Sequence, residues 1–159
     1  MATWTDKLSS IALHLPQTAA PLAAYVPANR VGNLVQTSGQ IPLVEGTLPI
    51  QGKVGTDVDV AVARELARVC ALNALAAVDD LVGIDSIVRV VKVVGFVASA
   101  PDFTNQPAVV NGASELLAEV FGDKAAHIRS AVGVAALSLD APVEIELVVE
   151  VDTDHQGTT

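Results

Sequence analysis

The aliphatic run at residues 86–98 (SIVRVVKVVGFVA) constrains the fold of this chain more than any other segment. Its many β-branched side chains favour a strand over a helix, so we predict one long strand here. Apolar side chains occupy both faces of that strand: Ile87, Val91, Val93 and Val97 on one, and Val88, Val90, Val94 and Phe96 on the other. A strand with this pattern is expected to be covered on both sides.

The composition indicates what covers the second face. The chain has 159 residues, enough for one domain with a full core, and 51% of them are apolar although only 3% are aromatic. This aliphatic excess is larger than a lone acidic domain needs. We therefore expect helices over one face of the long strand and a second copy of the chain over the other.

Charge and cysteine content argue against several classes of function. Nine Lys and Arg residues stand against eighteen Asp and Glu residues, and the resulting net charge of -9 counts against a nucleic-acid surface. The single Cys70 rules out a disulfide framework, and no Cys and His cluster fits a structural zinc site. The first residues lack a signal-peptide pattern, and no apolar stretch reaches the roughly 20 residues that span a bilayer. We expect a cytoplasmic protein in a reducing compartment, without a metal, membrane or nucleic-acid partner.

Glycine and proline divide the rest of the chain into short elements. Apolar spacing predicts a helix at 5–15 within an N-terminal extension (1–20), followed by a hairpin with its turn at 29–33 and its second strand at 34–39. A capping box at Thr56 and Asp59 predicts the start of a long helix that ends near 80–83. The other predicted elements are a helix at 108–121, ended by Gly122, and strands at 128–137 and 143–151. This order predicts a single α+β domain over 1–159, in which two helices back one face of a mixed or antiparallel sheet.

The common catalytic signatures are missing from the sequence, which has no Ser-His-Asp order, phosphate-binding glycine loop or metal-ligand spacing. Arg129 is the most informative polar residue, because a guanidinium at the mouth of an apolar strand needs an anionic partner. Two kinds of partner fit. One is a ligand carboxylate, and the other is a structural ion pair with Glu144 or Glu146 on a neighbouring strand.

Four separated motifs resemble the reactive-intermediate deaminase family, also called RidA or YjgF and, in older usage, L-PSP endoribonuclease. They are TSGQIP at 37–42, Phe96-Val97 with Asp102-Phe103, Arg129-Ser130-x-Val-x-Val, and VEIE at 143–146. The resemblance covers about residues 25–151. It implies a chorismate mutase-like homotrimer with a ligand cleft at each subunit junction. The implied activity is cofactor-independent hydrolysis of 2-imino acids and their enamines to 2-oxo acids and ammonium.

The resemblance also implies roles for individual residues. Arg129 matches the arginine that clamps the substrate carboxylate, and Glu144 matches the glutamate near the attacking water. The implied substrate-binding residues are Tyr25 from a neighbouring subunit, the strand end Ser38 and Gly39, Asn111 at the cleft edge, and Ala131, where family members often have cysteine. Asn111 also fits an ordinary polar residue at a helix N-terminus.

The chain departs from the best-studied members of the family close to the arginine. His127 stands where they have proline, and it could act as an acid or base or only as a hydrogen-bonded surface group. With the extension at 1–20 and a longer loop at 101–107, this indicates a longer-chain branch whose substrates could differ. Two alternatives to an imine deaminase stay open: a non-catalytic module that binds carboxylate metabolites, and an endoribonuclease. Cys70 has apolar neighbours and is expected to be a buried, unreactive thiol.

Overall fold

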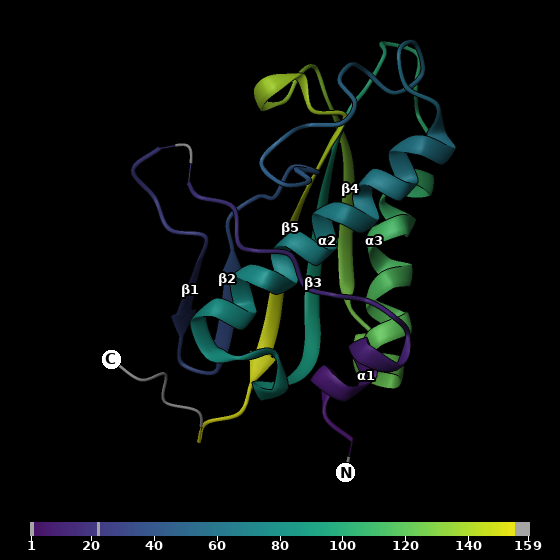
Figure 1. Cartoon of the computed structure of the whole chain (residues 1–159). Coiled ribbons are helices and arrows are strands. Elements are labelled where there is room, and N and C mark those ends of the chain that lie inside the picture. The colour runs from purple at the N-terminus through teal and green to yellow at the C-terminus, as the bar shows by residue number, and fades with distance from the viewer. Residues whose placement is uncertain (1, 22, 155–159) are drawn as a thin grey trace.

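The predicted central strand forms β3 (Ile87–Ala98), the longest strand of a five-stranded sheet with the order β1-β2-β5-β3-β4 (Figure 1). The computed structural model describes residues 2–21 and 23–154. β3 pairs antiparallel with β5 (Val143–Val151) and parallel with β4 (Ile128–Val134). The sheet is therefore mixed, and β4 forms one of its edges.

The predicted hairpin at the other edge of the sheet is confirmed. β1 (Ala28–Val31) and β2 (Leu34–Thr37) pair antiparallel around Gly32, whose φ of 62° suits a tight hairpin turn. β2 then pairs antiparallel with β5. At the opposite edge, β4 ends at Val134 rather than at the predicted residue 137, because its partner β3 ends at Ala98, directly opposite Val134.

Two long helices cover one face of the sheet, as predicted (Figure 1). They are α2 (Val60–Val82) and α3 (Gln106–Phe121), and α3 ends at Gly122. Short 3₁₀ turns complete the chain: η1 (Ile84–Ser86), η2 (Gly122–Ala125) and η3 (Ser138–Asp140). The predicted capping box is wrong. Asp59 is the N-cap of α2 but makes no side-chain capping bond, and the carboxylate of the nearby Asp57 instead accepts from the backbone N–H of Lys53 at 2.9 Å.

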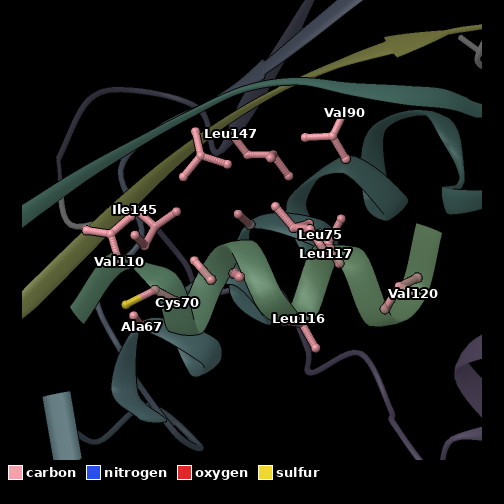
Figure 2. Close-up of a cluster of buried hydrophobic side chains, with 14 of the residues drawn as sticks. Ala67, Cys70, Leu75, Val90, Val110, Leu116, Leu117, Val120, Ile145 and Leu147 are labelled. Carbon is pink, nitrogen blue, oxygen red and sulfur yellow. The ribbon is translucent and has the colours of Figure 1, made fainter. Parts of the chain in front are cut away.

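The core lies between the helices and the sheet (Figure 2). Side chains from α2, α3, β3 and β5 meet there, and those of Leu75, Leu117, Val90 and Leu147 are buried. Along β5 every second residue is buried, from Val143 to Val151. The three glutamates that alternate with them face the uncovered side of the sheet, as the sequence pattern predicts.

The faces of β3 differ in part from the prediction. Its pairing with β5 shifts register between Ile87 and Arg89 and again between Val90 and Lys92. Each shift reverses the alternation of the strand, so the fully buried Val90, and not the partly exposed Val91, shares the helix-covered face with Ile87. The sequence pattern instead predicts Val91 on the face of Ile87 and Val90 on the other. Beyond these shifts Val93 and Val97 share one face as predicted, and both are buried.

The N-terminal extension packs against helices of its own chain. Helix α1 (Trp4–Ser10) stops before the predicted residue 15, because the backbone turns at Ala12, which has a φ of 56°. The Trp4 indole N–H donates to the carbonyl of Ile87 at 2.8 Å. Its ring also meets Phe121 edge-on, with 4.9 Å between the centroids.

After α1 the chain crosses the outer side of the helix layer towards β1 (Figure 1). The Thr18 hydroxyl donates to the carbonyl of Ala76 on α2 at 3.1 Å and attaches this crossing segment to the helix. The extension thus covers the helices, and within residues 2–21 and 23–154 no layer covers the opposite face of the sheet.

The tight approach of α2 and α3 leads to a stability prediction. A Cβ added at Gly112 of α3 would overlap the backbone carbonyl of Arg64 on α2. Replacing glycine by alanine inside a helix normally stabilises by about 1 kcal/mol. Here we expect Gly112→Ala to lower the free energy of unfolding by roughly 1–2 kcal/mol, because overpacking at a helix contact costs more than that gain.

Chemical denaturation of the wild type and the variant measures this difference. Ala118→Gly, at an exposed position of the same helix, serves as the control and should lose about 1 kcal/mol from helix propensity alone. A Gly112→Ala protein that is more stable than the wild type would contradict the close helix packing.

Candidate functional site

Arg129 lies on the edge strand β4 with its side chain on the helix side of the sheet. Its Cα pairs with that of Val93, which is fully buried beneath the helices. Paired residues of neighbouring strands point to the same face, so Arg129 points towards α3. Because β4 is an edge strand, the Arg129 side chain is only partly buried.

Two side chains of α3 hold the Arg129 guanidinium. Its NH1 group donates to Asn111 Oδ1 at 2.8 Å and to Ser114 Oγ at 3.2 Å. Asn111 and Ser114 are three residues apart and therefore lie on one face of the helix. The alternative view of Asn111 as a residue of the helix N-terminus is wrong, because the N-cap of α3 is Asn105.

A structural ion pair does not explain Arg129. Within residues 2–21 and 23–154, no carboxylate oxygen lies within 4.0 Å of the Arg129 guanidinium. The sheet order gives the reason, because β3 lies between β4 and β5 and keeps Glu144 and Glu146 away from the arginine. The predicted alternative of a pair with either glutamate is wrong within one chain.

His127 immediately precedes β4 and joins the group around Arg129. Its Nε2 lies 3.0 Å from Ser114 Oγ, and its Nδ1 lies 2.5 Å from the carbonyl oxygen of Ala125. Ser114 therefore contacts both His127 and Arg129. Ala131, two residues after Arg129, lies on the same side of β4 and packs against the core.

Sequence reasoning missed Ser114. The available signal was its spacing from Asn111, since polar residues at i and i+3 interrupt the largely apolar inner side of α3. Only the contact with His127 and Arg129 distinguishes Ser114 from an ordinary surface serine, and that contact joins segments that are distant in the sequence.

Glu144, the other predicted catalytic residue, lies on the opposite face of the sheet. It pairs with Phe96 of β3, whose position alternates with those of the buried Val93 and Val97. Partial burial raises the pKa of the Glu144 carboxyl, and repulsion from the neighbouring Glu146 raises it further. In the described part of the chain, no hydrogen-bond donor or cation contacts this carboxylate.

Gly39 approaches Glu144 directly, and two further predicted residues, Ser38 and Tyr25, lie beside Gly39. A Cβ at Gly39 would overlap the Glu144 carboxylate, so only glycine allows this approach. Gly39 also lines a pocket together with Tyr25 of the same chain. The Ser38 hydroxyl donates to the carbonyl of Val26 at 2.6 Å and so fixes the backbone beside Tyr25.

The predicted site residues therefore form two groups within one chain. The arginine group contains Arg129, Asn111, Ser114, His127 and Ala131, and the glutamate group contains Glu144, Gly39, Ser38 and Tyr25. Two strand spacings, about 10 Å, separate β4 from β5, and Glu144 lies three residues along β5 from Leu147, the residue level with Arg129. The Arg129 and Glu144 side chains also point to opposite faces, so the two groups do not share a site within one chain.

The remaining candidate features concern Cys70, metal ions and membranes. Cys70 is fully buried, and burial followed by the charge of Glu144 raises the pKa of its thiol well above the usual range, which confirms the predicted buried thiol. The described residues contain no group of three or more His, Cys, Asp or Glu side chains placed to hold a metal ion. They also contain no helix that is long and apolar enough to cross a membrane.

Comparison with known proteins identifies the family. Residues 5–151 match the family described as "YjgF/chorismate mutase-like, putative endoribonuclease". The chain therefore belongs to the YjgF/chorismate mutase-like family, and the predicted family and α+β fold are confirmed.

Individual relatives agree with this assignment. Protein TCP17 of Trypanosoma cruzi is 38% identical over 147 residues, which cover 91% of this chain and 92% of that protein. A crystal structure of a protein of unknown function from Agrobacterium tumefaciens is 44% identical with a TM-score of 0.86, covering 94% of this chain and 92% of its own. Escherichia coli TdcF, solved with bound serine, is 26% identical with a TM-score of 0.58, covering 86% and 94% of the two chains.

The environment of Glu144 leads to a prediction about pH and stability. Its folded-state pKa is raised above the ordinary value of 4.5, so the folded protein binds this proton more tightly than the unfolded chain does. Stability is therefore lost as the pH rises from 4.5 through the raised folded-state pKa. We expect Glu144→Gln to unfold at a higher temperature than the wild type at pH 7, and the difference to shrink near pH 4.

Thermal unfolding of both proteins at the two pH values tests this expectation. Glu65→Gln, on an exposed position of α2, removes one negative charge elsewhere and serves as the control. A Glu144→Gln protein less stable than the wild type at pH 7 would mean that the carboxylate makes a favourable contact that outweighs its burial.

Proposed function

We propose that this protein is a cofactor-independent deaminase that hydrolyses reactive 2-imino acids and their enamines to 2-oxo acids and ammonium. The observation that carries the proposal is the state of Arg129. It is a partly buried cation held by two neutral oxygen acceptors, without a carboxylate partner in the described chain. A guanidinium positioned in this way suits a planar ligand carboxylate.

A homotrimer with sites between subunits accounts for the separation of the two groups. In our proposal the arginine group of one subunit faces the glutamate group of its neighbour across a cleft. Two observations support this arrangement: Arg129 lies on an edge strand, and the face of the sheet that carries Glu144 has no covering layer within the described residues. Serine bound to TdcF shows that another family member holds a small molecule with a carboxylate.

The proposed reaction adds one water molecule across a C=N bond and then breaks that bond. Arg129 binds the substrate carboxylate and fixes C2 in the cleft. Glu144 accepts a proton from water as the water oxygen attacks C2 of the protonated imine, and the carboxyl then passes this proton to the amino group of the tetrahedral intermediate. The C–N bond then breaks, ammonia leaves, and the hydroxyl loses its proton to give the 2-oxo acid. A carboxyl with a raised pKa suits this exchange, because it can both take and return a proton.

The proposed cellular compartment and the two alternative functions can be weighed against the same observations. The one free thiol, Cys70, is buried, and a reducing cytoplasm suits such a protein. A non-catalytic module that binds carboxylate metabolites would use the same arginine, and one relative, from Lactococcus lactis, is named a regulator. An endoribonuclease is disfavoured by the net charge of -9, because RNA binding draws on cationic surface.

Turnover of a 2-imino acid tests the activity. We expect Arg129→Ala to lower kcat/KM for 2-iminopropanoate by roughly 10²–10³-fold, because each bond to a charged group contributes about 1.5–3 kcal/mol. Arg129→Lys should recover little of this loss, since an ammonium cannot make the paired bonds of a guanidinium. Glu144→Gln should lower kcat by about 10²-fold with little change in KM.

The assay generates the imine with an amino-acid oxidising enzyme and follows its disappearance. Glu65→Gln again serves as the control and should react like the wild type. If wild-type protein accelerates the loss of imine no more than Arg129→Ala does, the deaminase proposal fails. Binding of pyruvate that persists without turnover would then favour the binding module.

Mixing two inactive variants tests the intersubunit site. When Arg129→Ala and Glu144→Gln subunits are co-expressed in equal amounts, random assembly gives roughly a quarter of the clefts an intact Arg129 and an intact Glu144. We therefore expect the mixture to recover up to about a quarter of wild-type kcat, because each intact residue comes from a different subunit. The separately purified variants serve as the baseline, and a mixture that stays at that baseline would contradict a site shared between subunits.

A further inference from the structure

Ser114 lies between His127 and Arg129 and joins them. Its Oγ is 3.0 Å from His127 Nε2 and 3.2 Å from Arg129 NH1. All three side chains are partly buried. They come from α3, from the residue before β4 and from β4 itself, so their contact fixes the edge strand against the helix.

The acceptors around His127 define the direction of these hydrogen bonds. The carbonyl oxygen of Ala125, 2.5 Å from Nδ1, can only accept, so Nδ1 carries a hydrogen. In the neutral imidazole Nε2 is then an acceptor, and the Ser114 hydroxyl donates to it. With its hydrogen used in this way, Ser114 Oγ offers a lone pair to the NH1 group of Arg129.

This arrangement occupies one end of the guanidinium. NH1 carries two hydrogens, and they are directed to Asn111 Oδ1 and Ser114 Oγ. Among the residues that the structure describes, Nε and NH2 of Arg129 have no hydrogen-bond partner. Those two groups present parallel N–H bonds along one edge, which is the geometry that a carboxylate accepts in a bidentate contact.

We propose that Ser114 and His127 are positioning residues that turn the Nε–NH2 edge of Arg129 towards the substrate carboxylate. The proposal rests on the proposed carboxylate-binding function of Arg129 and adds which edge binds and what holds it. Asn111 alone would leave one NH1 hydrogen available and the guanidinium free to rotate about its single remaining bond. The hydroxyl of Ser114, directed by His127, removes that freedom.

The test measures binding and turnover in matched variants of the full chain. Binding of pyruvate is followed by titration calorimetry, and turnover of 2-iminopropanoate is followed as above. We expect Ser114→Ala to raise both the pyruvate Kd and the imine KM about tenfold with kcat within about threefold of the wild type, because a bond to a charged group is lost. Ser114→Thr keeps the hydroxyl and should stay within about twofold of the wild type in both measurements.

Two further variants complete the design. His127→Gln can still accept from Ser114 through its amide oxygen, so its pyruvate Kd should stay within about threefold of the wild-type value. His127→Leu cannot accept this bond, so its pyruvate Kd should rise about as much as that of Ser114→Ala. Ser10→Ala is the control, because the Ser10 hydroxyl donates within its own helix, to the Lys7 carbonyl. Nitrogen NMR of His127 should show hydrogen on Nδ1 and none on Nε2 in the neutral wild type.

The outcomes separate this proposal from the proposed function. Wild-type pyruvate affinity in Ser114→Ala, or equal losses in Ser114→Ala and Ser114→Thr, would overturn the positioning role while a loss in Arg129→Ala still supports the carboxylate clamp. Unchanged pyruvate affinity in Arg129→Ala would instead overturn the clamp itself. A His127 tautomer with hydrogen on Nε2 would also overturn the positioning role, because the Ser114 hydroxyl could no longer donate to it.

Discussion

The two-residue alternation of the sheet is the constraint on which the rest of this structure depends. Successive residues of β4 and β5 point to opposite faces of the sheet. Because α2 and α3 cover one face only, each of these residues points either to the core or to the uncovered side. Arg129 and Glu144 face different sides, and no side-chain rotation brings them together across β3. A site that uses both residues needs two copies of the chain, and assembly would also cover the aliphatic residues of β3 that the helices leave exposed.

Arg129 and Glu144 share one property: in the described chain, neither has an opposite charge beside it. A protein carboxylate beside Arg129 would neutralise its charge, whereas Asn111 and Ser114 satisfy its hydrogen bonds and leave the charge available to an anion. Glu144 is likewise partly buried and close to another carboxylate, and no cation contacts it in the described chain. The burial of the Glu144 carboxylate costs stability, and perturbed carboxyls of this kind are found more often at functional sites than elsewhere.

The sequence predicts the architecture well where the pattern is regular and less well where it is interrupted. The clean alternation of β5 allowed both of its ends to be predicted, and the glycine stop allowed the C-terminal end of α3 to be predicted, although α3 begins at Gln106 rather than at the predicted residue 108. The inner face of β3 was partly misassigned, because two register shifts leave no mark in a continuous aliphatic run. Ser114 was missed and the ion pair of Arg129 was wrongly considered for one reason: contacts across the sheet depend on strand order, which local spacing does not reveal.

The position of the N-terminal extension has a consequence for the order of folding. The bond from Trp4 to the Ile87 carbonyl joins residues 83 positions apart, and the Trp4 ring rests on Phe121, still farther along the chain. Neither partner is in place until β3 and α3 have formed. This segment is synthesised before both of its partners and can dock only after them, and such long-range closure slows folding relative to local helix formation.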